Sequence, residues 1–134
     1  MTLNNVQRRW LMIAAVAGAM AVALGAIGAH ALEPWLARQS GVTAEQAARR
    51  LENFKLGAHY QLLHALALLG SVPILSSRTA WPRWLWLAGI LLFSGGLYGY
   101  GVTGATQFVH VVPVGGMSLI AGWIALAITG YFDR

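Results

Sequence analysis

The chain has 134 residues, of which 57 % are hydrophobic and only 10 % are charged, and its mean hydropathy is +0.60. Because a soluble domain carries about 25 % charged residues, this composition excludes an ordinary soluble protein and predicts one integral membrane domain over residues 1–134. The absence of cysteine excludes disulfides, thiolate metal ligands and cysteine nucleophiles. The net charge of +5 comes from basic residues beside apolar segments, which favours contact with the lipid bilayer and argues against nucleic-acid binding.

The first apolar segment, residues 10–29, contains no charged residue and follows Arg8 and Arg9. A helix of about 20 residues crosses a hydrocarbon core of about 30 Å, so this segment is predicted to span the membrane. A signal peptide is the alternative, because Ala29-His30-Ala31 resembles a cleavage site. Signal peptides have apolar regions of about 7–15 residues, which is shorter than this segment.

The most polar part of the chain follows. Thr43 and Gln46 have the spacing of a capping box, which marks the start of a helix. Beyond them the apolar residues follow helical spacing, and Glu45 and Arg49 stand four residues apart, as in a favourable ion pair. We therefore expect an amphipathic helix over residues 44–57 that lies at the membrane interface, with a partner-binding helix as the alternative.

Three more spans are predicted over residues 58–75, 84–101 and 109–132. The expected fold is an all-α integral membrane four-helix bundle with the interfacial helix between its first two spans. An even number of spans places both termini on one side. That side carries five basic residues, namely Arg8, Arg9, Arg78, Arg83 and Arg134, against four on the other, namely Arg38, Arg49, Arg50 and Lys55. This excess predicts that both termini are cytoplasmic.

Small residues recur every four positions along three of the spans. In lipid, helices associate through close backbone approach, so such ridges are predicted to be contact faces. There are more of them than one small bundle needs, which favours a homo-oligomer or a larger membrane complex. The predicted packing residues are Ala17, Ala21, Gly25 and Ala29, then Gly95 and Gly99, then Ala121 and Ala125 with Thr129.

All four histidines fall beside the membrane face opposite the termini. His30 ends the first span, His59 and His64 belong to the second, and His110 begins the fourth. Tyr60 and His64 are four residues apart and share a helix face. An ionisable group at this depth needs a partner inside the bundle. We therefore expect His30 and His64 to meet at a common depth together with tyrosine side chains.

Five short motifs in order carry a resemblance to a known family: Gly25-Ala-Ile-Gly-Ala-His30-Ala31, Tyr60-Gln-Leu-Leu-His64-Ala-Leu66, Phe93-Ser-Gly-Gly-Leu-Tyr98, Pro113-Val-Gly-Gly116 and Gly122-Trp123. Together they resemble the YgdD-like family of small bacterial inner-membrane proteins, domain-of-unknown-function family 423, which is related to a small mitochondrial transmembrane protein. The resemblance covers the chain from the first span to the last. It implies a four-helix protein of the bacterial inner membrane with no established activity.

The family pattern, carried over residue by residue, supplies the candidate ligand-binding residues: His30, Tyr60, His64, Ser94, Tyr98, Pro113, Gly115, Gly116 and Trp123. His59 and His110 are not part of the pattern. Gly96 and Val112 stand where the family more often has a hydroxyl-bearing residue. Both departures weaken the case for a polar pathway through this site.

Four interpretations of the cluster stay open: an interhelical polar network, a site for a lipid-like or quinone-like ligand, a haem or metal site, and a transport pathway. Catalysis has little support, because Ser94 has no carboxylate in its span and no nucleotide or zinc-protease motif occurs. The expectation is therefore a non-enzymatic structural or accessory membrane protein with no cofactor and no metal. A binding protein for the lipid-like or quinone-like ligand is the alternative.

Overall fold

The computed structural model describes residues 3–74 and 80–132, and over these ranges it contains helices and no strand. The predicted all-α class is therefore confirmed. In chain order the elements are α1 (Asn5–His30), α2 (Leu32–Ala37), α3 (Ala44–Ser71), α4 (Trp81–Gly89), the π-helical turn η1 (Ile90–Ser94), α5 (Gly95–Thr103), the 3-10 helix η2 (Thr106–Val111) and α6 (Val112–Phe132).

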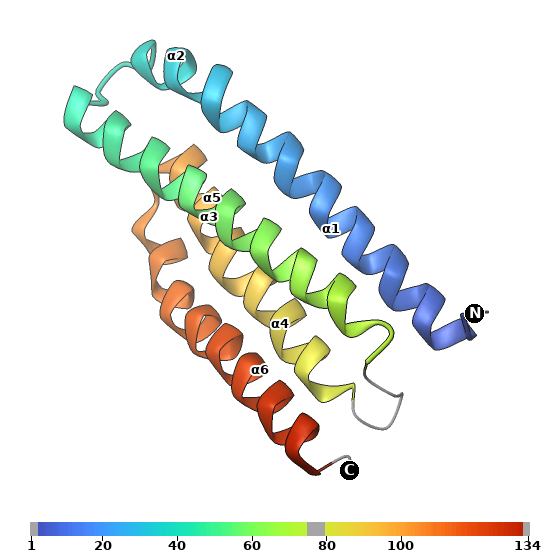
Figure 1. The fold of residues 1–134 in the computed structure, drawn as a ribbon. Coiled ribbons are helices and arrows are strands. Elements are labelled where there is room, and N and C mark those ends of the chain that lie inside the picture. The colour runs from blue at the N-terminus through green and yellow to red at the C-terminus, as the bar shows by residue number, and fades with distance from the viewer. Residues whose placement is uncertain (1–2, 75–79, 133–134) are drawn as a thin grey trace.

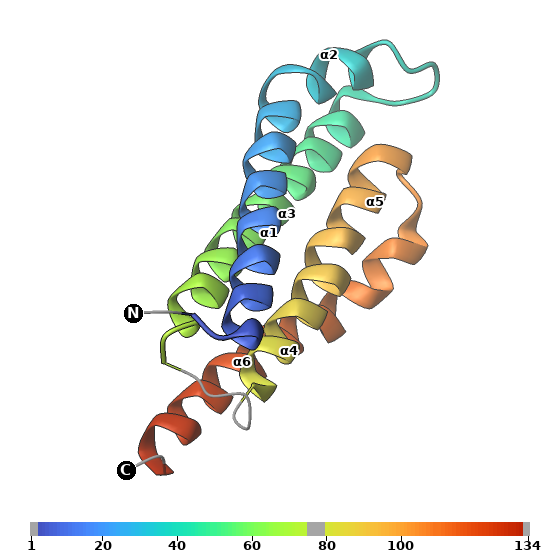
Figure 2. The ribbon, with the colours of Figure 1, turned by 90° about the vertical axis from the view of Figure 1, so that its right-hand side faces the viewer.

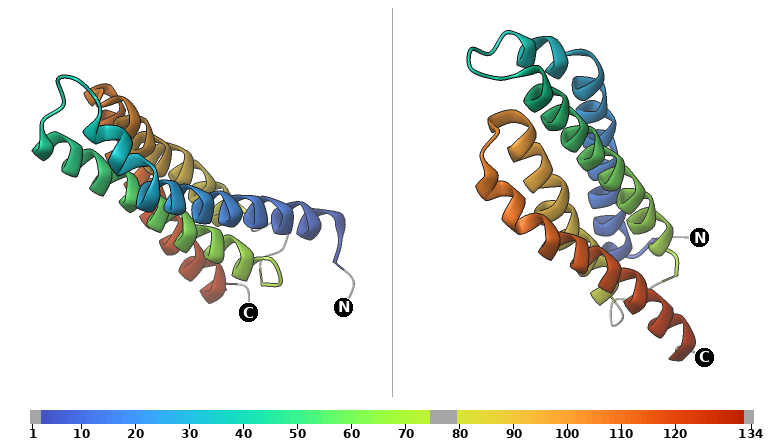
Figure 3. Two further views of the ribbon diagram at one scale, coloured as in Figure 1. Left: turned by 90° about the horizontal axis from the view of Figure 1, so that it is seen from above. Right: turned by 90° about the vertical axis from the view of Figure 1, so that its left-hand side faces the viewer.

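Four long rods lie side by side, each antiparallel to the next (Figure 1). Helix α1 packs on α3, and α3 packs on the rod formed by α4, η1 and α5. Helix α6 packs on that rod and also reaches α3 through a hydrogen bond between Trp123 and His64. Figures 2 and 3 show the rods from the side and from above, where they group into a bundle. The start of α1 and the end of α6 lie at the same end of the bundle, which we call the terminal end.

Three segments of the described chain are long and apolar enough to cross a membrane: Asn5–His30, Trp81–Thr103 and Thr106–Tyr131. The predicted count of four spans is thus not confirmed, because three of the described helices qualify by length and composition. The predicted second span, residues 58–75, belongs to α3, apart from Leu75, which lies outside the described residues. Helix α3 does not qualify because its charged N-terminal half and polar residues such as Gln61 and His64 lower its hydropathy. Of the basic residues counted for orientation, Arg78 and Arg134 also lie outside the described residues.

Helix α3 also corrects the expected interfacial helix, because residues 44–57 and the start of the predicted second span form one continuous rod. The capping box is confirmed: the Thr43 hydroxyl accepts from the Gln46 amide at 3.2 Å, and the Gln46 side chain accepts from the Thr43 amide at 2.9 Å. No proline interrupts the helix before Ser71. Phe54 is only 2 % exposed and Arg50 is 7 % exposed, so one face of the N-terminal half of α3 packs against the rest of the bundle.

The third predicted span is a rod with a π-helical turn at its centre, which the sequence analysis did not anticipate. At this turn α6 approaches the rod closely: a Cβ atom added at Gly115 would overlap the backbone of Phe93. Only glycine permits such a crossing. The turn therefore lies where α6 and the central rod are in backbone contact.

The apolar core divides into two clusters with a polar level between them. The larger cluster includes Trp10, Leu68 and Trp86 near the terminal end, and the smaller consists of Leu32, Leu36 and Phe54 near the opposite end. Gln61 and His64 lie between these clusters on α3, and both are at most 5 % exposed. The centre of the bundle is thus held by polar contacts.

Candidate functional site

Gln61 connects three helices at the middle of the bundle. Its Nε2 donates to the Ala17 carbonyl of α1 at 2.9 Å, and its Oε1 accepts from the Tyr98 hydroxyl of α5 at 2.9 Å. Both ends of the buried amide are therefore satisfied, as a buried polar group requires. The sequence analysis quoted Gln61 within a motif but did not single it out. Its signal was its position, seven residues after Phe54 on the same helix face.

His64 connects α3 to α6 through both ring nitrogens. Trp123 Nε1 donates to His64 Nε2 at 3.1 Å, and His64 Nδ1 lies 2.8 Å from the Tyr60 carbonyl oxygen. Because the indole can only donate, Nε2 must be an acceptor, and Nδ1 must then carry the proton that is donated to the carbonyl. The geometry thus selects the neutral Nδ1–H tautomer. No ring nitrogen is left to bind a ligand or a metal ion.

Aromatic rings surround His64. The Tyr60 ring stacks on it with centroids 6.2 Å apart and an interplanar angle of 13°, and also packs against Phe93 at 4.9 Å. The Trp123 ring contacts Trp86 at 5.0 Å. Tyr60 and Trp123 remain partly exposed on the outside of the bundle. The cluster is therefore filled by its own side chains and leaves His64 enclosed.

His30 does not join this cluster. It is exposed at the end of α1, and Gly28 lies against Phe54 while Gly18 lies against Ala65. His30 is thus level with the N-terminal half of α3 and stands about 18 Å from the level of His64, at 1.5 Å per residue. The expected meeting of the two imidazoles at one depth is not found. His59 and His110 are exposed as well.

The other candidate ligand-binding residues are dispersed. Ser94 is fully buried beside the π turn, and its hydroxyl has no hydrogen-bond partner among the described residues. Pro113 is exposed at the start of α6. Gly115 and Gly116 pack against Phe93 as part of the helix crossing. Of the nine candidates, the structure groups Tyr60, His64 and Trp123, and it connects Tyr98 to them only through Gln61 on α3.

The small-residue ridges occupy several different environments. Ala17, Ala21 and Gly25 face α3, whereas Ala29 is exposed. Gly95 is exposed with open space around it, while Gly99 lies against the Phe108 ring. On α6, Ala121 is half-buried, and Ala125 and Thr129 are buried.

Two buried arginines, which the sequence analysis treated only as boundary charges, bind the carbonyl ends of helices. Arg50 donates from Nε to the Gly101 carbonyl at 3.0 Å and from Nη2 to the Val102 carbonyl. At the terminal end, Arg83 donates from Nε to the Ser71 hydroxyl at 3.0 Å and from Nη2 to the Ser71 carbonyl at 2.6 Å. A cation at a helix C-terminus is stabilised by the helix dipole and satisfies free carbonyls. Each arginine thus fastens one rod to the end of its neighbour.

Metal binding gains no support from this arrangement. Within the described ranges, no group of three histidine, aspartate or glutamate side chains is placed to hold a metal ion. An apolar groove of about 500 Å³ lies elsewhere, between α1 and the central rod. Its wall includes Met20, Leu91 and Gly95, with Gln61 and Tyr98 as its polar members.

Comparison with known proteins gives relatives along nearly the whole chain. The UPF0382 inner membrane protein YgdD of Escherichia coli K12 is 37 % identical over 127 residues, covering 92 % of this chain and 88 % of that protein. The UPF0382 membrane protein SSP2132 of Staphylococcus saprophyticus is 34 % identical over 123 residues, covering 89 % and 93 %. A UPF0382 membrane protein of Haemophilus influenzae is 33 % identical over 124 residues, covering 90 % and 92 %. No solved structure matches the chain.

The family model described as "Protein of unknown function (DUF423)" matches residues 24–116. This range contains Gln61, His64 and the first residues of α6, whereas Ala17 and Trp123, which bond to Gln61 and His64, lie outside it. Together with the three apolar helices, the match and the relatives establish a membrane protein whose multi-pass character fits the bacterial inner membrane. The chain belongs to the DUF423 family of membrane proteins, also named UPF0382, for which no activity is established.

Proposed function

We propose that α3 crosses the membrane as a fourth span, with both termini on the cytoplasmic side. Helices α1 and α4–α5 run in the same direction through the bundle, and α3 is the rod that returns between them. A chain that crosses through α1 must come back before it can cross again in the same direction. The polar residues that lower the hydropathy of α3 are paired inside the protein, which makes its burial in hydrocarbon tolerable.

Single-cysteine labelling tests this topology cleanly, because the chain has no cysteine of its own. Ser40, in the link before α3, and Ile74, just after it, are both exposed. In intact spheroplasts, a membrane-impermeant maleimide should label Ser40→Cys, and it should label Ile74→Cys only after lysis. If both positions react from the same side, α3 does not cross. If Ile74→Cys alone reacts in intact spheroplasts, the crossing holds and the orientation is reversed.

We further propose that the protein is a non-enzymatic accessory protein that associates with a second copy or a larger membrane complex through the outer face of α1. The supporting observation is the division of α1 into two faces. One face, with Ala21 and Gly25, packs on α3. The opposite face presents Ala15, Ala19 and Ala23, which are all exposed and spaced four residues apart. A ridge of this kind allows a second helix to approach closely in lipid.

The contacts of the buried polar side chains support the non-enzymatic part of this proposal. Gln61, His64 and Arg50 all bond to neighbouring helices, so their contacts are structural. A catalytic role needs groups that are free to touch a substrate. The cluster of His64 and Tyr60 thus holds the helices together, and the protein acts through its exposed surface.

Ala19→Leu tests the association. The added side chain should prevent close helix approach and weaken self-association by about 1–3 kcal/mol, which is roughly tenfold to a hundredfold in the dissociation constant. The measurement is native mass spectrometry from mild detergent, together with crosslinking in native membranes. Ala127→Leu, at an exposed alanine of α6, is the matched control and should leave association unchanged. An unaltered oligomer or complex in Ala19→Leu contradicts the proposal.

A lipid-like ligand in the groove between α1 and the central rod is the second candidate function. The groove has a volume of about 500 Å³, within the range of about 300–1,000 Å³ that is typical of small-molecule sites. Its lining is apolar apart from the amide of Gln61 and the hydroxyl of Tyr98, both of which already bond to protein. This composition suits an acyl or isoprenoid chain.

Gly95→Leu tests this alternative, since Gly95 lines the groove and a Cβ atom added there would meet no other atom within 4 Å. If a ligand occupies the groove, the lipid-sized adduct in native mass spectra should disappear in Gly95→Leu. The adduct should persist in Gly130→Leu, which changes an equally open glycine on α6. An adduct retained in both variants places the lipid elsewhere, and no adduct in the unmodified protein rules out a stable groove ligand.

A further inference from the structure

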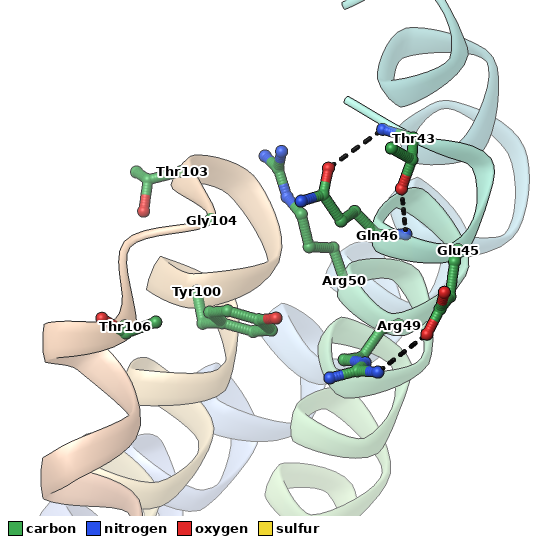
Figure 4. A pocket seen from close by; sticks show the side chains of 9 residues that line it. All are labelled: Thr43, Glu45, Gln46, Arg49, Arg50, Tyr100, Thr103, Gly104 and Thr106. Carbon is green, nitrogen blue, oxygen red and sulfur yellow. Dashed lines mark hydrogen bonds and ion pairs between the residues drawn. The ribbon is translucent and has the colours of Figure 1, made fainter. Parts of the chain in front are cut away.

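A polar cavity lies at the end of the bundle opposite the terminal end, between the start of α3 and the link from α5 to η2 (Figure 4). Its volume is about 580 Å³. It is lined by Arg49 and Arg50, by the hydroxyl-bearing Tyr100 and Thr103, and by Glu45. None of these side chains contributes to the contacts of Gln61 and His64.

The cavity carries a positive charge that the protein does not neutralise. Arg49 pairs with Glu45 at 3.0 Å, the one ion pair found among the described residues. Arg50 is 7 % exposed and bonds only to backbone carbonyls, through Nε and Nη2. Two guanidinium groups against one carboxylate leave one net positive charge on the cavity wall. The α5 dipole offsets part of it, because its C-terminal end equals roughly half a negative charge.

Hydrogen-bond donors remain free in the cavity. Arg50 Nη1 has no partner within the described part of the chain, and the same holds for the Tyr100 hydroxyl. Gly104, with φ of +72°, lets the chain pass close to the guanidinium, since a Cβ there would lie 3.4 Å from Nη1. Figure 4 shows the Tyr100 ring reaching from α5 toward Arg49 on α3. Tyr100 and Arg49 thus face one another across the cavity, and the Arg50 guanidinium lies on its Gly104 side.

The depth of the cavity indicates the source of an anion. Two of the three candidate membrane spans meet there, because Thr103 ends one and Thr106 begins the next. The cavity therefore lies at the boundary of the hydrocarbon core, at the level of lipid phosphates. Guanidinium groups bind phosphate oxygens through paired, charge-assisted hydrogen bonds.

We propose that this cavity binds the phosphate group of an anionic phospholipid headgroup, with Arg50 and Arg49 as the cationic contacts and Tyr100 as a hydroxyl donor. A purely structural role for Arg50, as the cap of α5, explains its two carbonyl bonds. It does not explain the second arginine or the unpaired tyrosine on the same cavity. The site is separate from the outer face of α1, so it does not depend on the proposed association.

Calorimetric titration of the full-length protein in neutral detergent tests the site, with dihexanoyl phosphatidylglycerol, dihexanoyl phosphatidylcholine and inorganic phosphate as three probes. We expect one phosphatidylglycerol to bind per chain. Arg49→Gln should weaken this binding by about tenfold or more, since it removes a charge-assisted contact. Glu45→Gln should strengthen it, because it removes the negative charge. Tyr100→Phe should weaken it with helicity unchanged.

Arg38→Gln is the matched control, because Arg38 is an exposed cation at the same end of the bundle outside the cavity. Its phosphatidylglycerol affinity should equal that of the unmodified protein. Equal losses in Arg38→Gln and Arg49→Gln would show diffuse surface attraction and overturn the site. Absence of phosphatidylglycerol binding, or equal affinity for phosphatidylcholine, would also overturn it. Inorganic phosphate bound as tightly as phosphatidylglycerol would overturn the lipid source.

Discussion

A polar group buried inside a helical bundle must find its partner within the protein, because an unpaired buried polar group costs free energy. This constraint organises the DUF423 bundle around α3, which bonds to each of the other rods. Gln61 reaches α1 and α5, His64 receives Trp123 from α6, and Arg83 of α4 binds the end of α3. Such bonds are worth only about 0.6–2 kcal/mol each in membranes, but each fixes the register of two helices. Helix α3 is therefore the element that sets the position of all the others.

The same constraint explains why the family motifs include polar residues without forming an evident active site. Tyr98 and Trp123 donate to α3, so the acceptor atoms of Gln61 and His64 are already engaged within the protein. The surface carries three further features: the small-residue ridge on the outer side of α1, the apolar groove and the cationic cavity near Arg50.

The helical class, the capping box at Thr43 and the three strongly apolar spans were predictable, because composition, local spacing and hydropathy determine them. The packing and relative alignment of these helices were not predictable. The division of α3 into an interfacial helix and a span followed hydropathy, yet Arg50, Phe54, Gln61, His64 and Ser71 are spaced by three, four or seven residues on one continuous buried face. The prediction that His30 lies at the depth of His64 was wrong. The alignment of α1 with the antiparallel α3 depends on contacts such as Gly28 against Phe54, which no local sequence pattern reveals. The π turn was also not predicted, because it lies where Gly115 of α6 contacts the central rod, which is a contact between distant parts of the sequence.

A double-mutant cycle between Gln61 and Tyr98 tests most directly whether paired polar groups of α3 hold the bundle together. The free energy of unfolding would be measured in bicelles for Gln61→Leu, Tyr98→Phe and the double variant. The bond between the Tyr98 hydroxyl and Gln61 Oε1 predicts a coupling energy of about 0.6–1.7 kcal/mol. Single effects that add to the double effect within about 0.3 kcal/mol would show that the two side chains do not act together and would contradict this account.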